Sequence, residues 1–440
     1  MALEFKLAQF AHPLTLLRLR RQFMLDERLS AEELGQLQWR RLKRVAVRAF
    51  RDVPYYRRLF AALGINPHDL QSEADWRTLP LLGRREILRE GSELHSCSIN
   101  RSGVAAVQTS GTSGERLSLL MDRSANALEF NYYWRYWGWA GYLLGDRFAE
   151  FSSAAFLGAN AAQPFEFRRL GNRLLLNSLR LNDRIFSAHC EILRECRPRF
   201  LKGLPSVLEE LAAFLERTGE RVPPLQAVFC TGEPLSDRCR LRLFNAFRSR
   251  IWNSYGHMER TVAASDCIEG NLHIHSDYGH FETLKEPDGK FRVLGTSLHN
   301  SAMPLLRYEV GDRVEIDDPS GTLPPCRCGS PFPRISRVLG RTLDLLLAPD
   351  GTRIAGASLL FDEVPGIGRA QIIQTAADRF KIRIEPSTGF EDATAKALCA
   401  RLADCMTVPV QVDWETPEPG QSWTEPGRKF RPIVPWIGLG

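Results

Sequence analysis

A stretch of hydroxyl and glycine residues near residue 110 has the composition of a phosphate-binding loop. Residues 107–121 read VQTSGTSGERLSLLM, with Thr109, Ser110, Gly111, Thr112, Ser113 and Gly114 at the centre. Backbone N–H groups and hydroxyls can converge on anionic oxygens where glycines let the chain curl closely around them. No Gly-Lys-Ser/Thr follows and the next segment is strand-like, which excludes a Walker loop. On composition alone, a plain Ser/Gly turn is the alternative.

Three cysteines and one histidine form a second candidate site. They are Cys267, His273, Cys326 and Cys328. Three thiols and one imidazole are a ligand set for tetrahedral zinc, and four protein ligands would make the site structural. The Cys-x-Cys spacing is tighter than the usual Cys-x-x-Cys. The alternative is therefore a set of buried free cysteines, with His273 or His275 hydrogen-bonded on a strand.

Further short motifs follow the hydroxyl-rich loop along the chain. They are FCTGEPLS, NSYGHMER, PLLRYEVGDRVEI, VLGRTLDLL and PGRKFR. With TSGTSGERL before them, they resemble the adenylate-forming superfamily of acyl-CoA synthetases, aryl acid ligases and adenylation domains. DVPYYRRLF, LKGLPSVL and AMPLLRYEVGD narrow the resemblance to the phenylacetate-CoA ligase and CapK-type branch. The resemblance covers nearly the whole chain.

The resemblance implies a site for Mg-ATP. It implies that the loop at 109–114 holds the β- and γ-phosphates, and that Gly232 and Glu233 lie beside adenine. It also implies that Tyr255 and Gly256 pack on adenine and that Glu259 is a magnesium ligand. The chemistry of the last assignment agrees, because magnesium prefers carboxylate and phosphate oxygens.

The resemblance also implies roles for four residues nearer the C-terminus. Asp312 would grip both ribose hydroxyls, which suits a carboxylate because it accepts two hydrogen bonds at once. Arg341 is expected near the ribose and phosphate, and Asp344 matches a hinge between two domains. Lys429 in PGRKFR would be the catalytic lysine, approaching the reacting oxygens on a mobile loop.

One residue departs from the superfamily pattern. Relatives commonly carry Thr or Ser before the magnesium-binding Glu, where the hydroxyl donates to the α-phosphate. This chain has Met258, which cannot donate. The neighbouring His257 is either a substitute donor or a structural histidine.

The elements that must position these residues follow from the apolar pattern. Residues 1 to about 95 are mainly helical, with one helix beginning at Ser30 and ending at Val53 before Pro54. From about 100 to 340, strand-like runs such as 149–157 and 225–232 alternate with helices such as 205–219, which favours α/β layers. An aromatic-rich helix precedes residue 145, and its rings either pack in the core or line an acid pocket.

The last part of the chain is predicted to be a separate small domain. Strand-like segments at 351–364, 371–386 and 408–415 flank a helix at 393–406, an α+β pattern. We therefore predict an α/β protein with a large N-terminal adenylate-forming domain (1–342) of mixed sheets and helices, including a helical extension over about 1–95. A small mobile α+β domain (345–440) would carry the catalytic lysine.

Composition excludes several other classes of protein. The net charge of +6 and pI near 8.8 are mild for 440 residues, and the basic residues are dispersed, which argues against a nucleic-acid partner. No apolar run reaches the length of a membrane-spanning helix, and there is no signal-peptide pattern, so we expect a cytoplasmic protein. The ten cysteines are scattered, as expected for reduced thiols.

The sequence thus predicts activation of a carboxylic acid, possibly aromatic, by ATP to acyl-AMP and pyrophosphate. Transfer to a thiol would follow, with coenzyme A or the phosphopantetheine of an acyl carrier protein as acceptor. Two alternatives stay open: adenylation followed by transfer to an amine, or adenylation with no thioester step. An alternative of another class, motivated by Met258 and Ala348, is a nucleotide-binding protein that has lost catalysis. The acid, the acceptor and the oligomeric state stay open.

Overall fold

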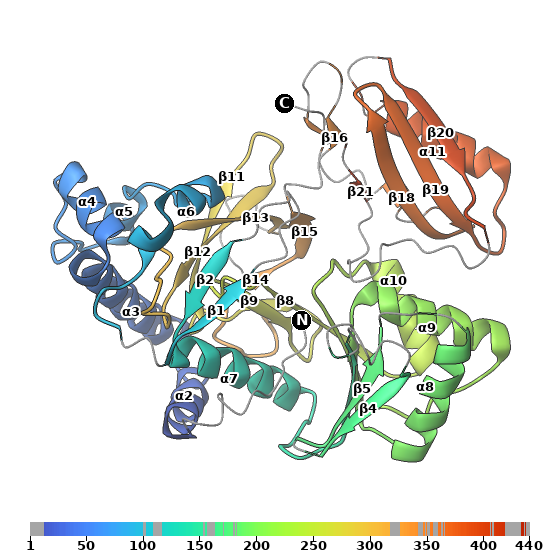
Figure 1. Ribbon diagram of the computed structural model, residues 1–440, viewed down its shortest axis with the longest axis horizontal. Helices are drawn as coiled ribbons and strands as arrows, with labels where there is room; N and C mark the ends of the chain where they lie inside the picture. Colours follow the sequence, from blue (N-terminus) through green and yellow to red (C-terminus); the bar gives the residue numbers. More distant parts are fainter. Residues whose placement is uncertain are drawn as a thin grey trace. The chain divides into compact units, whose positions relative to one another are not determined.

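Figure 1 shows the computed structural model of the chain. It describes residues 13–99, 103–108, 117–152, 155, 163–169, 171–178, 181, 183–316, 326–341, 346–347, 349, 353–354, 360–361, 364, 366–404, 406, 409–418, 433–434 and 436. The chain divides into two compact units. The first comprises Met1–Asp146, Phe229–Gly232 and Trp252–Val338, and the second comprises Arg147–Val228, Glu233–Ile251 and Leu339–Gly440.

The first unit begins with a series of helices. They are α2 (Pro13–Asp26), α3 (Ala31–Asp52), α4 (Pro54–Leu63), α5 (Glu73–Arg77), α6 (Arg84–Glu90) and the 3-10 helix η1 (Gly91–Leu94). Ser30 caps α3 as predicted, because its side chain accepts from the N–H of Glu33 while the Glu33 carboxylate accepts from the N–H of Ser30. Pro54 opens α4 at a position where a missing N–H is tolerated.

An antiparallel hairpin follows these helices. Strands β1 (Ala105–Gln108) and β2 (Ser118–Met121) pair so that Ala105 faces Met121 and Gln108 faces Ser118. The predicted strand, loop and strand are confirmed for the two strands, whereas the predicted phosphate loop lies outside the described residues. Asp122 then caps the aromatic-rich helix α7 (Arg123–Trp139) by accepting a hydrogen bond of 2.8 Å from the N–H of Ala125.

Two sheets complete the first unit. One contains, in spatial order, β14 (Arg334–Ile335), β10 (Leu272–Ile274), β9 (Ala263–Asp266), β8 (Arg250–Gly256) and β7 (Ala227–Thr231). The other contains, in order, β11 (Gly279–Lys285), β12 (Phe291–Ser297), β13 (Tyr308–Glu315) and β15 (Arg337–Arg341). A shared apolar core joins the N-terminal helices to these strands through side chains such as Leu42, Tyr56, Trp76, Val293 and Tyr308.

The second unit contains a parallel sheet with helices. Strand β3 (Phe148–Ser152) lies between β6 (Phe200–Gly203) and β5 (Arg173–Asn177), parallel to both, and β4 (Phe165–Arg168) is antiparallel to β5. The helices are α8 (Asp183–Cys196), α9 (Pro205–Thr218) and α10 (Asp237–Phe247), drawn in green in Figure 1. The ring of Phe151 on β3 contacts His189 on α8 at a centroid distance of 5.5 Å. This contact places α8 on that face of the sheet.

The C-terminal part of the chain has a core of its own. Short strands β16 (Leu346–Leu347) and β17 (Arg353–Ile354) precede a sheet with the order β20, β19, β18, β21. Its elements are β18 (Ile367–Ala376), β19 (Arg379–Pro386), α11 (Asp392–Asp404), β20 (Gln411–Glu415) and β21 (Ile433–Val434). Figure 1 shows α11 against this sheet, and Leu398 and Leu402 of α11 share a buried cluster with Ile372 and Ile382.

One segment of this part differs from its prediction. Residues 371–386, expected to form a single strand, belong to the hairpin of β18 and β19. A two-residue turn at Ala377 and Asp378 reverses the chain, and Asp is a residue that such turns favour. The predicted domain boundary between residues 342 and 345 lies outside the described residues and stays a prediction.

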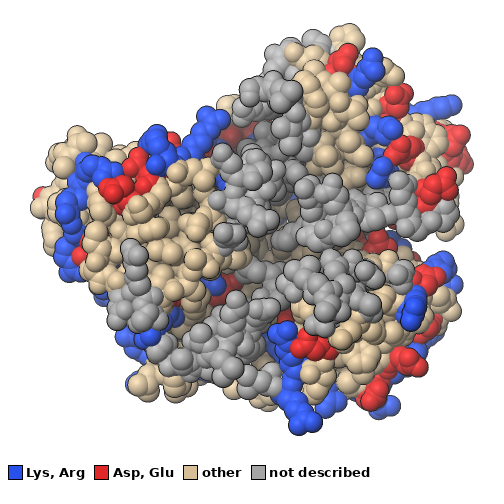
Figure 2. Space-filling model, in the orientation of Figure 1, with Lys and Arg blue, Asp and Glu red and all other residues tan. Residues whose placement is uncertain are grey.

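Basic and acidic residues are mixed on the surface, as they are along the sequence. On the face drawn in Figure 2, basic side chains in blue and acidic side chains in red are interspersed. Within the described residues, no helix combines the length and the apolar character that crossing a membrane requires.

Candidate functional site

Glu259 lies in a tight turn between strands β8 and β9. The turn closes through a hydrogen bond of 3.1 Å from the N–H of Arg260 to the carbonyl of His257. Arg260 has a φ of 54°, in the left-handed region that costs a side-chain-bearing residue about 1 kcal/mol or more. Its guanidinium donates at 2.7 Å to the amide oxygen of Asn126 on α7, which anchors the turn to that helix.

The carboxylate of Glu259 is held on both oxygens. Oε1 accepts a hydrogen bond of 3.0 Å from the hydroxyl of Tyr308, and Oε2 lies 3.1 Å from Nδ1 of His257. On the other side of the imidazole, Nε2 lies 3.2 Å from the hydroxyl oxygen of Thr261. All four side chains are buried. The carboxylate predicted to bind magnesium therefore has a fixed orientation.

Tyr255 and Asp312 are hydrogen-bonded to each other. The Tyr255 hydroxyl at the end of β8 donates to Oδ2 of Asp312 on β13 at 2.7 Å. Gly311, just before Asp312, has a φ of 81°, a conformation that glycine adopts without strain. The structure therefore brings together three predicted nucleotide-site residues of this unit: Tyr255 and Asp312 by direct contact, and Glu259 through the adjoining turn.

Gly232 and Glu233 follow strand β7, as expected from the CTGE motif. Gly232 has a φ of 81°, so the chain turns sharply at this point. Both Glu233 oxygens accept hydrogen bonds from Ser206, at 3.0 Å from its N–H and 3.1 Å from its hydroxyl. Ser206 lies in the first turn of α9, where N–H groups have no partner within the helix. Glu233 therefore has a structural contact that the sequence did not indicate.

The remaining nucleotide-site predictions are not described in the same detail. Arg341 ends β15, and only its place in that strand is described. The predicted phosphate loop (109–114), the hinge residue Asp344 and the catalytic Lys429 lie outside the described residues. The roles given to these residues stay predictions.

The four predicted zinc ligands come together. Their ligand atoms, one from each of Cys267, His273, Cys326 and Cys328, all lie within 4.8 Å of one another. The two sulfurs of Cys267 and Cys326 are 3.9 Å apart, and the Cys328 sulfur is 3.4 Å from Nε2 of His273. Tetrahedral zinc with bonds of about 2.3 Å to sulfur requires sulfur atoms about 3.8 Å apart. The cluster therefore has the dimensions of a zinc site.

Neighbouring groups orient the ligands of this cluster. His273 Nδ1 lies 2.6 Å from the carbonyl of Phe332, which fixes the hydrogen on Nδ1 and leaves Nε2 facing the thiols. Burial lowers the pKa of His273 and keeps the imidazole neutral, the form that binds metal. His275, the alternative considered from the sequence, lies instead against Ser265, with Nε2 2.7 Å from the hydroxyl.

The thiols of Cys326 and Cys328 differ in how readily they ionise. Burial would raise the pKa of Cys326, but hydrogen bonds from Cys328 and Asn271 bring it below its ordinary value. Burial raises the pKa of Cys328 to about 12. Thiols this close together cannot all become thiolates without a cation to offset the repulsion, and a bound metal supplies one.

The aromatic helix α7 is mostly core. Phe130, Tyr133 and Trp137 are buried, and Trp137 contacts Tyr142 and Phe229 edge-on or tilted. These contacts support the packing interpretation over an acid pocket for Trp137. Arg135 on the same helix forms a buried ion pair with Asp277, with two contacts of 2.5 and 2.9 Å.

Sequence reasoning missed the residues that support the predicted site. Tyr308 and Thr261 hold Glu259 and His257. Away from this site, Arg135 binds Asp277 across 142 positions of the chain. Tyr308 begins the YEVGD motif, so its place in that motif was the available signal. Nothing local in the sequence marks Arg135, because its partner is distant.

The sequence of the chain is similar to those of several known proteins. The chain is 25% identical over 402 residues to phenylacetate-coenzyme A ligase of Thermus thermophilus, covering 83% of this chain and 84% of that protein. The chain is similar to the phenylacetate-CoA ligases. It is also 26% identical to the Pseudomonas putida ligase over 338 residues, 73% of each chain, and 26% identical to CapK of Staphylococcus aureus over 176 residues, 40% of this chain and 38% of CapK. No protein-family model matches the chain.

Solved structures give the fold. A 2-hydroxyisobutyryl-CoA ligase in the postadenylation state, in complex with an acyl-AMP, has a TM-score of 0.71 at 19% identity, covering 94% of this chain and 91% of that chain. The same ligase in an open conformation has a TM-score of 0.59, with 93% of each chain covered. The predicted α/β fold class is therefore confirmed, and the curated relatives bear out the resemblance to phenylacetate-CoA ligases and CapK.

Proposed function

We propose that this chain is an acid–thiol ligase that activates a carboxylic acid with ATP and transfers the acyl group to coenzyme A. The observation that carries the proposal is the hydrogen bond between Tyr255 and Asp312, with Glu259 in the adjoining turn. These three residues are the ones that the resemblance assigns to adenine, ribose and magnesium. The likeness to phenylacetate-CoA ligases supports the same reaction.

The first half-reaction would form an acid anhydride. A carboxylate oxygen of the acid attacks the α-phosphorus of ATP, the bond to the β-phosphate oxygen breaks, and pyrophosphate leaves. Asp312 would accept hydrogen bonds from the ribose hydroxyls while Tyr255 packs on adenine, so the α-phosphate is fixed in register with the acid. Bound magnesium would offset the charge of the phosphate oxygens, and Glu259 is the residue that would hold it.

The second half-reaction would form the thioester. The thiolate of coenzyme A attacks the acyl carbonyl, the bond to the phosphate oxygen breaks, and AMP leaves. Lys429 acts before this step: in the first half-reaction, it is the residue proposed to offset charge on the reacting oxygens. The phosphopantetheine of a carrier protein is chemically equivalent to coenzyme A at its thiol and is the alternative acceptor.

The substrate class follows from the curated relatives. Their name specifies phenylacetate, so we propose an aromatic acid for this chain. Met258 leaves the α-phosphate without the hydroxyl donor that relatives commonly carry. His257 does not replace it, because both imidazole nitrogens already face protein groups. Loss of catalysis with retained nucleotide binding is therefore the second candidate function, and Met258 is the observation that favours it.

Acid-dependent exchange of pyrophosphate into ATP tests the proposal. Aryl and alkyl carboxylic acids are supplied one at a time with Mg-ATP and labelled pyrophosphate, followed by coenzyme A for acids that respond. We expect exchange with at least one aromatic acid, and Glu259→Gln should reduce it by about a hundredfold or more. If no acid gives exchange while ATP still binds, the degenerate function holds. Exchange without thioester formation would favour an amine acceptor.

We also propose that Cys267, His273, Cys326 and Cys328 bind a structural zinc ion. The close approach of three sulfurs and a neutral imidazole supports it, as does the hydrogen bond that orients His273. All four ligands come from the protein, so the site has no open position for a substrate. The ion would tie the 267–273 segment to the 326–328 segment. A cytoplasmic location and a carrier-protein partner stay predictions.

A further inference from the structure

The Glu259 carboxylate is the centre of a chain of four buried polar side chains. Tyr308 contacts one carboxylate oxygen and His257 the other, and Thr261 contacts the far side of the imidazole. The relative exposures are 5% for Glu259, 7% for His257, 2% for Tyr308 and 0% for Thr261. A buried carboxylate with a fixed rotamer presents its oxygens in one direction only.

The contacts of His257 indicate which ring nitrogen carries the hydrogen that faces Glu259. A carboxylate only accepts hydrogen bonds, so the hydrogen of the imidazole must lie on Nδ1, facing Glu259. Nε2 lies 3.2 Å from the Thr261 hydroxyl oxygen, which can donate to it or accept from it. The opposite tautomer would place a nitrogen lone pair against the carboxylate. The Glu259 carboxylate therefore requires the hydrogen on Nδ1, and the Thr261 hydroxyl contacts the far side of the ring.

Two glycines of the neighbouring sheet lie close against Thr261. A Cβ at Gly279 on β11 would lie 1.8 Å from the Thr261 carbonyl oxygen, and a Cβ at Gly295 on β12 would lie 2.2 Å from its hydroxyl oxygen. Neither approach is possible for any other residue, since real Cβ contacts are not found under 3.0 Å. The backbone of this sheet thus approaches closely the residue that contacts the far side of the imidazole.

We propose that Tyr308 and His257 are positioning residues that aim the Glu259 carboxylate at the divalent cation of the nucleotide, with Thr261 fixing His257. The proposal rests on the proposed function, which assigns that cation to Glu259. The two oxygens of a carboxylate offer about four lone-pair directions, so protein contacts on both oxygens are compatible with binding a cation. Groups behind a metal ligand of this kind typically change metal affinity or activity by about 10- to 100-fold when removed.

Binding of manganese with ATP, followed by the electron paramagnetic resonance of free Mn²⁺, tests the proposal without turnover. Manganese accepts the same carboxylate and phosphate oxygens as magnesium. We expect the wild-type chain to bind Mn-ATP more tightly than Tyr308→Phe by about tenfold, and more tightly than Tyr308→Phe combined with His257→Gln by about a hundredfold. Thr261→Val should weaken binding in the same direction.

Matched variants separate positioning from loss of stability. Tyr132 is also 2% exposed and donates its hydroxyl to a buried acceptor, the carbonyl of Ala264. Tyr132→Phe therefore removes a buried hydrogen bond from the same unit and should leave Mn-ATP affinity unchanged. Thr296, which is 0% exposed and accepts from the N–H of Arg307, is the matching control for Thr261. Thermal unfolding of every variant shows whether it is folded.

The outcomes distinguish this proposal from the proposed function. Wild-type affinity in folded Tyr308→Phe and in the double variant would overturn the positioning role. An equal loss in Tyr132→Phe would overturn it as well, because the effect would then be one of general stability. If the wild-type chain binds Mn-ATP but shows no acid-dependent exchange, the ligase function fails while the positioning role is judged on the variants. No Mn-ATP binding by the wild-type chain would overturn both.

Discussion

The hydroxyl of Tyr255 donates to the carboxylate of Asp312 at 2.7 Å, and this contact joins the end of β8 to β13. The aromatic ring proposed to pack on adenine and the carboxylate proposed to bind ribose are therefore a single hydrogen-bonded pair. Neither side chain can rotate without breaking the contact. The spacing of the two ligand-binding groups is set before a nucleotide arrives.

Removing this hydroxyl should weaken nucleotide binding. Tyr255→Phe keeps the ring but removes its hydrogen bond to Asp312, so we expect the dissociation constant for ATP to rise about fivefold, as for the loss of one hydrogen bond. Isothermal titration calorimetry measures the change. Tyr132→Phe, which removes a buried hydroxyl bonded to the carbonyl of Ala264, is the control and should bind ATP normally. Unchanged affinity in Tyr255→Phe would refute the coupling.

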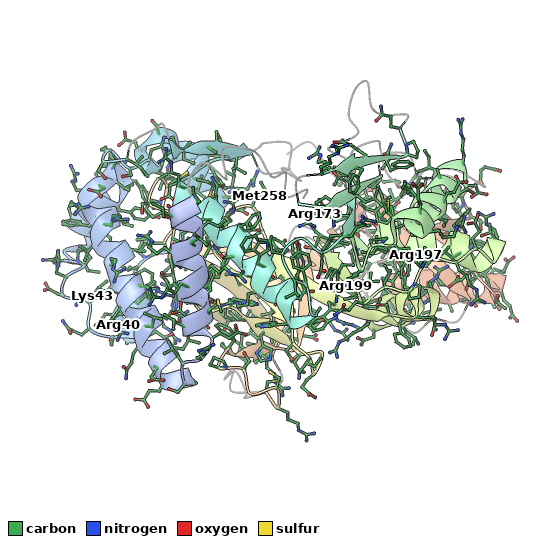
Figure 3. The ribbon with its side chains drawn as sticks, turned by 90° about the horizontal axis from the view of Figure 1, so that it is seen from below. Arg40, Lys43, Arg173, Arg197, Arg199 and Met258 are labelled. Carbon is green, nitrogen blue, oxygen red and sulfur yellow. The ribbon has the colours of Figure 1, made fainter. Side chains whose placement is uncertain are left out.

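Restoring the missing hydroxyl should raise activity. Met258 is partly exposed in the turn before Glu259 and is labelled in Figure 3. Met258→Thr should fit this turn and supply a donor near the α-phosphate. A hydrogen bond to a charged group contributes about 1.5 kcal/mol or more, so pyrophosphate exchange should accelerate about tenfold. Met258→Val, which has the same shape without the hydroxyl, should not accelerate it. Equal rates in the two variants would show that this chain does not use a donor there.

The proposed zinc site predicts the metal content and the melting temperature of the purified protein. Purified protein should contain about one zinc ion per chain, and Cys328→Ser should lose it together with several degrees of melting temperature. Cys97 is an exposed free cysteine outside the cluster, so Cys97→Ser should retain both. Elemental analysis and thermal unfolding give the two readouts. Protein that lacks zinc after purification with the metal supplied would refute the site.

A buried histidine should make stability depend on pH. Burial lowers the pKa of His189 to about 4, although the hydrogen bond from its Nε2 to the Pro164 carbonyl acts in the opposite direction. The unfolded chain, with an ordinary pKa near 6.5, binds more protons between these values, so stability falls as pH falls through that window. The loss from pH 7 to pH 4 should be about 3 kcal/mol for this group.

Comparison with His189→Gln isolates this contribution from the other titrating groups. Glutamine can still donate to the Pro164 carbonyl but does not titrate. The free energy of unfolding, measured in urea across the pH range, should therefore depend less steeply on pH in the variant. Parallel curves for the two proteins would contradict the assignment.

Part of this site was accessible from the sequence because its chemistry is local. NSYGHMER and YEVGD mark Tyr255, Glu259 and Asp312, and the Cys/His set is visible from residue types alone. The contacts that hold these groups were not accessible, because they join distant segments. Tyr308 reaches Glu259 across 49 positions, and Glu233 reaches Ser206 across 27. No periodicity or spacing encodes such pairs.

The difference between local signals and distant contacts also explains which parts of the fold could be predicted from the sequence. The helix beginning at Ser30 was predictable because a capping box is encoded within four residues. The hairpin of β1 and β2 was predictable because two apolar runs flank a loop. The reversal at Ala377 and Asp378 was missed, since two residues within a long apolar segment give a weak turn signal.

The hydrogen bonds from Ser206 to Glu233 affect how the CTGE motif should be interpreted in homologous chains. Because this glutamate secures the start of α9, its replacement would be selected against even in a descendant that no longer bound a nucleotide. Its presence in a homologue is therefore evidence of an intact scaffold and not of a working enzyme. Surveys that sort homologues into active and inactive members should therefore not rely on this glutamate alone.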